Sequence, residues 1–174
     1  VAPTGVVTTS TISNYKENAE KITAISGEEK TVTVETMSAA RNVKYEMTVI
    51  NNYNNTIDGI SILGRIASKE NTELGSNIEM PLTSGITVSS KDNSKVEIYY
   101  TENANADKDL SKQANGWTKT PADLSKVKSY LIVLKDYQMN TAEAIDFTLK
   151  QFTNPEYKVI DSLDEINAIG HRLV

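Results

Sequence analysis

Three stretches of this chain alternate apolar and polar side chains, and no recognisable catalytic motif lies within them. They cover residues 43–50, 95–101 and 145–150. Successive side chains of a β-strand point to opposite faces of the sheet, so each stretch has one face to bury and one to expose. Such alternation is typical of antiparallel sheets with one solvated side. The pattern favours an all-β fold and says much more about architecture than about any reaction.

Length and charge narrow the classes of function. The chain has 174 residues, enough to bury a core without a disulfide or a metal. Its 18 basic and 23 acidic residues are spread along the sequence, so no basic stripe indicates nucleic-acid binding. No apolar run is long enough to insert into a membrane. The absence of cysteine fits an exported bacterial protein that never relied on disulfides. We expect no cofactor.

The remaining sequence indicates about eight to ten short strands at a spacing of roughly ten residues. Gly59 and Gly64 interrupt the expected strand at 57–66, which indicates a bulge or a bend. Residues 78–82 predict a short edge strand, and the apolar run 130–134 predicts a central strand buried on both faces. No long amphipathic helix separates these strands. We therefore expect a two-layer antiparallel β-sandwich of Ig-like, Greek-key type with at most short helical turns.

The organisation of the chain follows from these signals. We expect residues 1–30 to form an extended segment, either an edge strand or a linker. Residues 31–154 should form the sandwich module. Residues 155–174 should form a strand or a short helix, or the start of a next module. Ser162 and Glu165 match a capping box, so we expect a helix at 163–169 that ends at Gly170. Residues 171–174 should then leave the domain.

Stability should come from burial of the apolar members of the alternating runs, at about 25 cal/mol per Å². The expected core consists of Val32, Val34, Tyr45, Met47, Val49, Ile60, Ile62, Ile98, Tyr100, Leu131, Val133, Ile145, Phe147 and Leu149.

Several segments carry a family resemblance. Residues 43–52 show a Tyr-x-x-Thr-Val-x-Asn strand that runs into an Asn-rich turn, and the pieces 96–103, 115–117 and 123–134 add to it. Together they resemble the Ig-like β-sandwich repeat modules of large Gram-positive, adhesin-type surface proteins, over about residues 43–153. The resemblance implies a stalk or adhesin module at the cell wall or cell surface. Its partners would be neighbouring modules of the same protein and a host or glycan ligand.

The same motifs are structural, so we expect a non-catalytic module and no enzyme. His171 is the single imidazole, and Ser61 lacks a nucleophile elbow. The alternative function is carbohydrate binding, with Trp117, Tyr99 and Tyr100 as an aromatic platform. Against that alternative, Trp117 could plug the end of the sandwich while Tyr100 belongs to the core.

Modules of the kind resembled can cross-link themselves through a Lys–Asn isopeptide bond. Lys44 is the candidate amine, Asn154 or Asn51 the candidate amide, and Glu97 or Asp146 the candidate acid. The reaction needs a neutral amine in an apolar site. The plain alternative places Lys44 on the solvated face of its strand.

Two acidic turns could supply oxygen ligands for calcium. They are Asp107-Lys108-Asp109 and Asp92-Asn93-Ser94. Neither matches a complete calcium loop with its terminal glutamate. Solvated turn acids explain both better, so we expect no metal.

Overall fold

The computed structural model describes residues 5–14, 22–25, 31–32, 40–72, 78–153, 166–167 and 171–173. One sheet contains β1 (Val6–Ser13), β2 (Ile22–Ile25), β4 (Arg41–Asn51), β7 (Thr87–Ser89) and β11 (Ala144–Thr153). The second contains β6 (Ser61–Arg65), β8 (Val96–Thr101), β9 (Ser129–Leu134) and β13 (His171–Leu173). Two short ladders pair β5 (Ile57–Asp58) with β10 (Gln138–Met139) and β3 (Thr31–Val32) with β12 (Ile166–Asn167).

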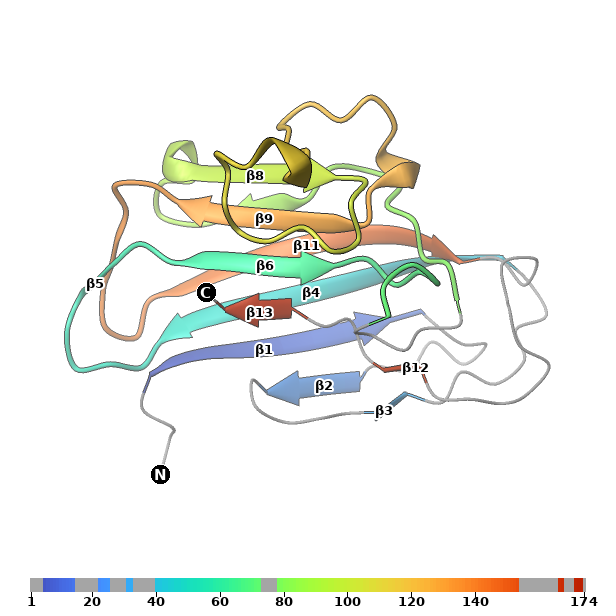
Figure 1. Cartoon of the computed structure of the whole chain (residues 1–174). Helices are drawn as coiled ribbons and strands as arrows, with labels where there is room; N and C mark the ends of the chain where they lie inside the picture. Colours follow the sequence, from blue (N-terminus) through green and yellow to red (C-terminus); the bar gives the residue numbers. More distant parts are fainter. Residues whose placement is uncertain are drawn as a thin grey trace.

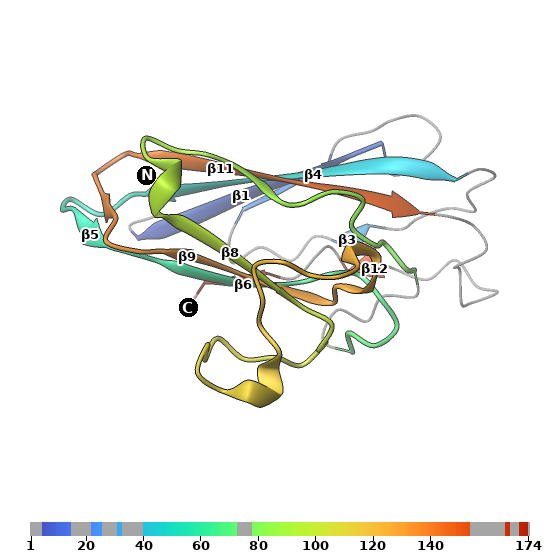
Figure 2. The ribbon, with the colours of Figure 1, turned by 90° about the horizontal axis from the view of Figure 1, so that it is seen from above.

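The two larger sheets face each other as two layers (Figures 1 and 2). Strand order is β2-β1-β4-β11-β7 in the five-stranded sheet and β13-β6-β9-β8 in the four-stranded sheet, and all the pairs are antiparallel. Helical structure in the described residues is limited to three 3-10 turns, η1 (Asn93–Lys95), η2 (Gln113–Asn115) and η3 (Leu124–Lys126). The expectation of an all-β, two-layer antiparallel sandwich is confirmed.

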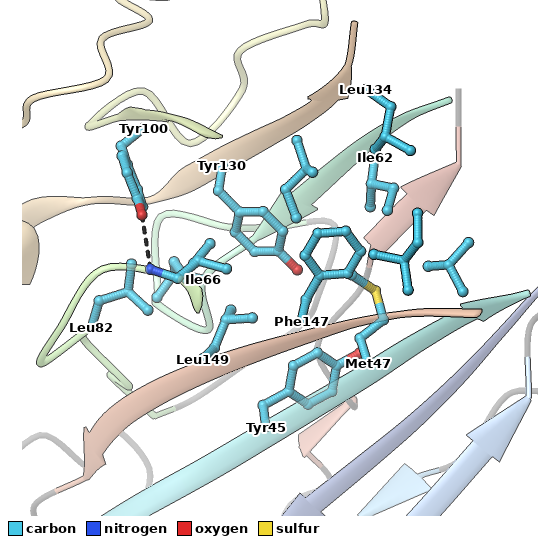
Figure 3. Close-up of a cluster of buried hydrophobic side chains, with 14 of the residues drawn as sticks. Tyr45, Met47, Ile62, Ile66, Leu82, Tyr100, Tyr130, Leu134, Phe147 and Leu149 are labelled. Carbon is cyan, nitrogen blue, oxygen red and sulfur yellow. Dashed lines mark hydrogen bonds between the residues drawn. The ribbon is translucent and has the colours of Figure 1, made fainter. Parts of the chain in front are cut away.

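The core lies between the two sheets and is built by the alternating strands (Figure 3). Strands β4 and β11 pair over ten residues, and their inward side chains meet in register, as Met47 does with Phe147. The expected core residues that are buried are Tyr45, Met47, Val49, Ile62, Tyr100, Leu131, Ile145, Phe147 and Leu149. Ile60, Ile98 and Val133 are only half-buried. Val34 lies outside the described residues, as does the side chain of Val32.

Strand β9 corrects one part of the expected core. Its core-facing residues are Tyr130, Ile132 and Leu134, not Leu131 and Val133. Leu131 is buried on the opposite face of the sheet. Residues 102–117 cross the sheet on that face (Figures 1 and 2). A strand that is apolar on both faces carries no alternation, so its sequence does not show which face meets the other sheet.

The two glycines of segment 57–66 have different roles. The strand breaks at Gly59, whose φ of +51° is a left-handed conformation, so the expected bend is confirmed there. At Gly64 the strand continues. A Cβ atom at Gly64 would lie 1.9 Å from Cζ of Tyr130, so the tyrosine ring occupies the space of a side chain.

Two local expectations differ from the structure. In segment 78–82 only Leu82 forms a bridge, to Gln151, while the Phe152 N–H donates to the carbonyl of Pro81 (2.9 Å). In the expected helix 163–169, residues 166–167 form β12 instead, and the other residues lie outside the described part.

The tail also departs from its expected course. Residues 171–173 form β13 against β6 rather than leaving the domain. Capping signals report local preference, whereas tertiary pairing decided both strands. The division at residues 30 and 154 stays a prediction.

Candidate functional site

Two of the candidate platform residues, Trp117 and Tyr99, lie on the outer face of the four-stranded sheet, turned away from the core. Tyr99 of β8 pairs with Leu131 on that face. A single bridge joins Thr118 to Tyr100, with N–H···O distances of 2.8 and 3.0 Å. Because side chains alternate along extended chain, Trp117 and Lys119 then share the face of Tyr99. We call Glu97, Tyr99, Trp117 and Lys119 the aromatic patch.

A long loop, residues 102–117, crosses the same face of the sheet (Figures 1 and 2), and its last residue, Trp117, belongs to the patch. We call it the strap. The buried Arg65 donates from Nη1 to the Ala106 carbonyl (2.7 Å) and to Ser129 Oγ (2.9 Å). Ser129 Oγ donates to the carbonyl of Asn103 (2.7 Å). These contacts attach main-chain atoms of the strap to side chains of the sheet, which fixes its position.

The strap also holds Trp117. The indole Nε1–H donates to the carbonyl of Asp107 (2.8 Å), and the ring is half-buried. Asn115 orders the same turn, since its amide donates to Asp107 Oδ1 (2.6 Å) and to the carbonyl of Asp109 (2.9 Å). Trp117 therefore combines a partly exposed ring with a fixed orientation.

Tyr99, Glu97 and Lys119 form one polar network. The Tyr99 hydroxyl donates to Glu97 Oε2 (2.5 Å), and Lys119 Nζ lies 3.2 Å from Glu97 Oε1. Lys119 Nζ also lies 5.3 Å from the centroid of the Tyr99 ring, within range of a cation–π contact. The Tyr99 hydrogen bond is the main cause that lowers the pKa of Glu97, followed by Lys119. Glu97 in turn raises the pKa of Tyr99.

Tyr100 does not belong to the patch. It is 6% exposed and points into the core, where its hydroxyl accepts a hydrogen bond from the Ile86 N–H (2.8 Å), the dashed line in Figure 3. The alternative that places Tyr100 in the core therefore describes its position. Lys119 completes the patch and was missed from the sequence. Its place on this face follows only from the bridge that Thr118, the residue before it, forms with Tyr100.

Among the described residues, the isopeptide candidates are not brought together. Lys44 is half-exposed on the outer face of the five-stranded sheet, 2.7 Å from Glu46 Oε1. Glu97 lies on the outer face of the opposite sheet, so the whole core separates the two. Asn154 lies outside the described residues. The arrangement lacks the apolar surroundings that a neutral lysine amine requires.

The other two isopeptide candidates have structural partners. The Asn51 amide is fully buried and donates to the carbonyls of Asn55 (3.0 Å) and Met139 (2.9 Å). Asp146 accepts a hydrogen bond from Thr48 Oγ1 (2.5 Å) on the outer face. Asn51 thus organises the Asn-rich turn that follows β4.

The two acidic turns satisfy their own carboxylates. Asp107 Oδ2 lies 2.9 Å from Lys112 Nζ, and this contact is the main cause that lowers the pKa of Asp107 to about 2. Asp92 caps η1 by accepting from the N–H (3.2 Å) and Oγ (2.5 Å) of Ser94. Among the described residues, no group of three or more His, Cys, Asp or Glu side chains is placed to hold a metal.

A charged cleft of about 950 Å³ opens at the end of the sandwich near β5 and β10. Its lining residues are Asp58, Gly59, Lys91, Asp92, Lys95, Asp136, Tyr137 and Gln138. Lys91 is bound to Glu143 (2.8 Å), and the Tyr137 hydroxyl donates to the same carboxylate (2.5 Å). The sequence signals for this cleft were the bend at Gly59 and the acidic turn at Asp92.

The two catalytic residue types considered from sequence lie on the neighbouring strands β6 and β13. Ser61 pairs with Val133 on the outer sheet face. His171 pairs through its main chain with Gly64, and its side chain lies outside the described part.

Comparison with known proteins does not show a family. No protein-family model matches the chain. A stretch of 43 residues, a quarter of the chain, is 54% identical to acetate kinase of Phocaeicola vulgatus. The chain spans about a tenth of that enzyme's length, 11%. No helix of the described residues is long and apolar enough to cross a membrane.

Two solved structures are distantly similar. One is CBM3b of the major scaffoldin subunit ScaA from Acetivibrio cellulolyticus, at 8% identity and a TM-score of 0.33, covering 79% of this chain and 76% of the other. The second is a CBM of Ruminiclostridium thermocellum, at 12% identity and a TM-score of 0.32, covering 84% and 85%. At these scores the two structures carry no argument about what this chain binds.

Proposed function

We propose that the chain is a non-catalytic module of a bacterial cell-surface protein, acting as a stalk, a spacer or a binding domain. The observation that supports this function is how the polar side chains considered for chemistry are used. Asn51, considered for an isopeptide bond, and Asp107, considered for calcium, each hold a loop by hydrogen bonds to the main chain, as does the neighbouring Asn115. Groups committed in this way stabilise a scaffold and are not poised for proton transfer or nucleophilic attack.

The proposal places the sandwich at the cell wall or cell surface, next to neighbouring modules of the same protein. Because β1, β2 and β13 pair within its two sheets, residues 6–13, 22–25 and 171–173 belong to the sandwich itself. Assays against ester, glycoside and phosphomonoester substrates should show no turnover. The proposal would be overturned if the chain turned over one of these substrates and a single side-chain substitution in the described residues abolished that turnover. Thermal unfolding should be unchanged by EDTA.

A second function, carbohydrate binding, is favoured by one specific observation. Trp117 and Tyr99 share the outer face of one sheet, and both rings are half-buried rather than covered. Sugar rings stack on such partly exposed aromatic side chains. Because Trp117 is the single tryptophan, its fluorescence reports directly on this patch. A spectrum that stays unchanged across a broad panel of glycans removes this second function and leaves the first.

A further inference from the structure

Two ammonium groups act on Glu97, the one carboxylate of the aromatic patch: Lys119 within the patch and Lys135 just after β9. Both Lys119 and Lys135 lower the pKa of Glu97 through their charge. The side chain of Glu97 is 25% exposed and that of Lys119 is 52% exposed, so both charges are accessible at the surface. A ligand with a negative charge therefore meets the exposed ammonium of Lys119 at the patch, whereas a neutral ligand gains no such attraction.

Lys119 also controls access to the aromatic surface. Its ammonium lies over the ring of Tyr99, and 52% of its side chain is exposed. A neutral sugar that stacks on this ring has to displace the ammonium without offering it a new partner. An anionic sugar supplies that partner, because its charge can draw Lys119 away from the ring. The Lys119–Glu97 pair opposes this change only weakly, since exposed ion pairs contribute about 0–1 kcal/mol.

We propose that the aromatic patch binds acidic saccharides, with the sugar ring stacked on Tyr99 and Trp117 and its carboxylate paired with Lys119. The proposal rests on the carbohydrate-binding function and names its ligand class. Trp117 is held ready for this contact, because its indole N–H is bound to Asp107 and its orientation is set before any ligand arrives. Such pre-organisation reduces the entropic cost of binding.

The test titrates the whole chain with three probes while Trp117 fluorescence is recorded. The probes are an oligogalacturonate, a neutral cello-oligosaccharide of the same length, and sodium acetate. The oligogalacturonate should bind at least about tenfold more tightly than the neutral sugar, as expected for a hydrogen bond to a charged group. Acetate should cause no change, because it has no ring to stack.

Two lysine variants separate the outcomes. Lys119→Gln should lower affinity for the oligogalacturonate about tenfold and leave affinity for the neutral sugar equal or higher, since the Tyr99 ring is then free. Lys44→Gln, on the opposite sheet, is the matched control and should bind like the wild type. Equal losses in both variants would mean nonspecific attraction and would overturn the proposal.

The remaining outcomes separate the preference for acidic saccharides from carbohydrate binding itself. Equal binding of acidic and neutral sugars, unaffected by Lys119→Gln, would overturn the preference for acidic saccharides but keep carbohydrate binding. No response to either sugar would overturn both and leave the structural function.

Discussion

Two tyrosines that point into the same core should respond in opposite ways to loss of the hydroxyl group. Tyr130 is fully buried, and among the described residues its hydroxyl has no hydrogen-bond partner. Figure 3 shows its ring between the sheets, directed toward Phe147. Tyr100, from the neighbouring strand, accepts a hydrogen bond from the Ile86 N–H (2.8 Å). Comparing the two tyrosines separates the free-energy cost of burying a hydroxyl group from the free energy gained when that hydroxyl forms a hydrogen bond.

The expected magnitudes follow from these partners. An unsatisfied buried polar group costs about 1–3 kcal/mol, so Tyr130→Phe should raise the free energy of unfolding by about 1 kcal/mol. Tyr100→Phe removes the acceptor and leaves the Ile86 N–H buried without it, which should lower the free energy of unfolding by about 1–3 kcal/mol. Both substitutions keep the ring, so neither creates a large cavity.

Urea denaturation followed by far-UV circular dichroism measures both changes, and the slope of the transition should stay constant. For a chain of this size, 1 kcal/mol corresponds to a shift in Tm of about 2–4 °C. A Tyr130→Phe variant destabilised by more than about 1 kcal/mol would show that the hydroxyl has a partner, and would refute the reasoning. A neutral Tyr100→Phe variant would show that the Ile86 N–H finds another acceptor.

Three further predictions concern separate parts of the molecule. Gly64→Ala should lower the free energy of unfolding by about 1–3 kcal/mol in urea, because the new Cβ overlaps the ring of Tyr130, and a neutral effect would contradict the close packing seen there. The pKa of Asp107 is lowered to about 2, so the stability that its carboxylate gives the strap is complete above its ordinary pKa of 3.8. That stability is lost as the pH falls through about 2. Trp117 fluorescence should therefore change between these two pH values and not near pH 5. An Asp107→Asn variant should lack this acid transition, and its persistence would exclude Asp107 as the cause. Intact mass should equal the sequence mass, because exposed Lys44 is paired with Glu46, whereas a loss of about 17 Da, one ammonia, would demonstrate an isopeptide bond.

The candidate site could be predicted only in part. Trp117 and Tyr99 were recognisable as candidate platform residues, but nothing in their spacing placed them on one face. That placement depends on the bridge between Thr118 and Tyr100, which joins segments separated by the whole strap. Lys119 enters the patch for the same reason. The position of the buried Arg65 likewise depends on the strap, because its guanidinium donates to the Ala106 carbonyl.

The sequence by itself determined the all-β character and the inward faces of β4, β8 and β11, because alternation of side chains is a local property of extended chain. It also indicated the bend at Gly59 through the residue type. Only the tertiary structure decided which face of β9 meets the core, where the strap lies, and that residues 166–167 pair as a strand. These features depend on contacts between distant segments, and the free energy of those contacts outweighs local preference.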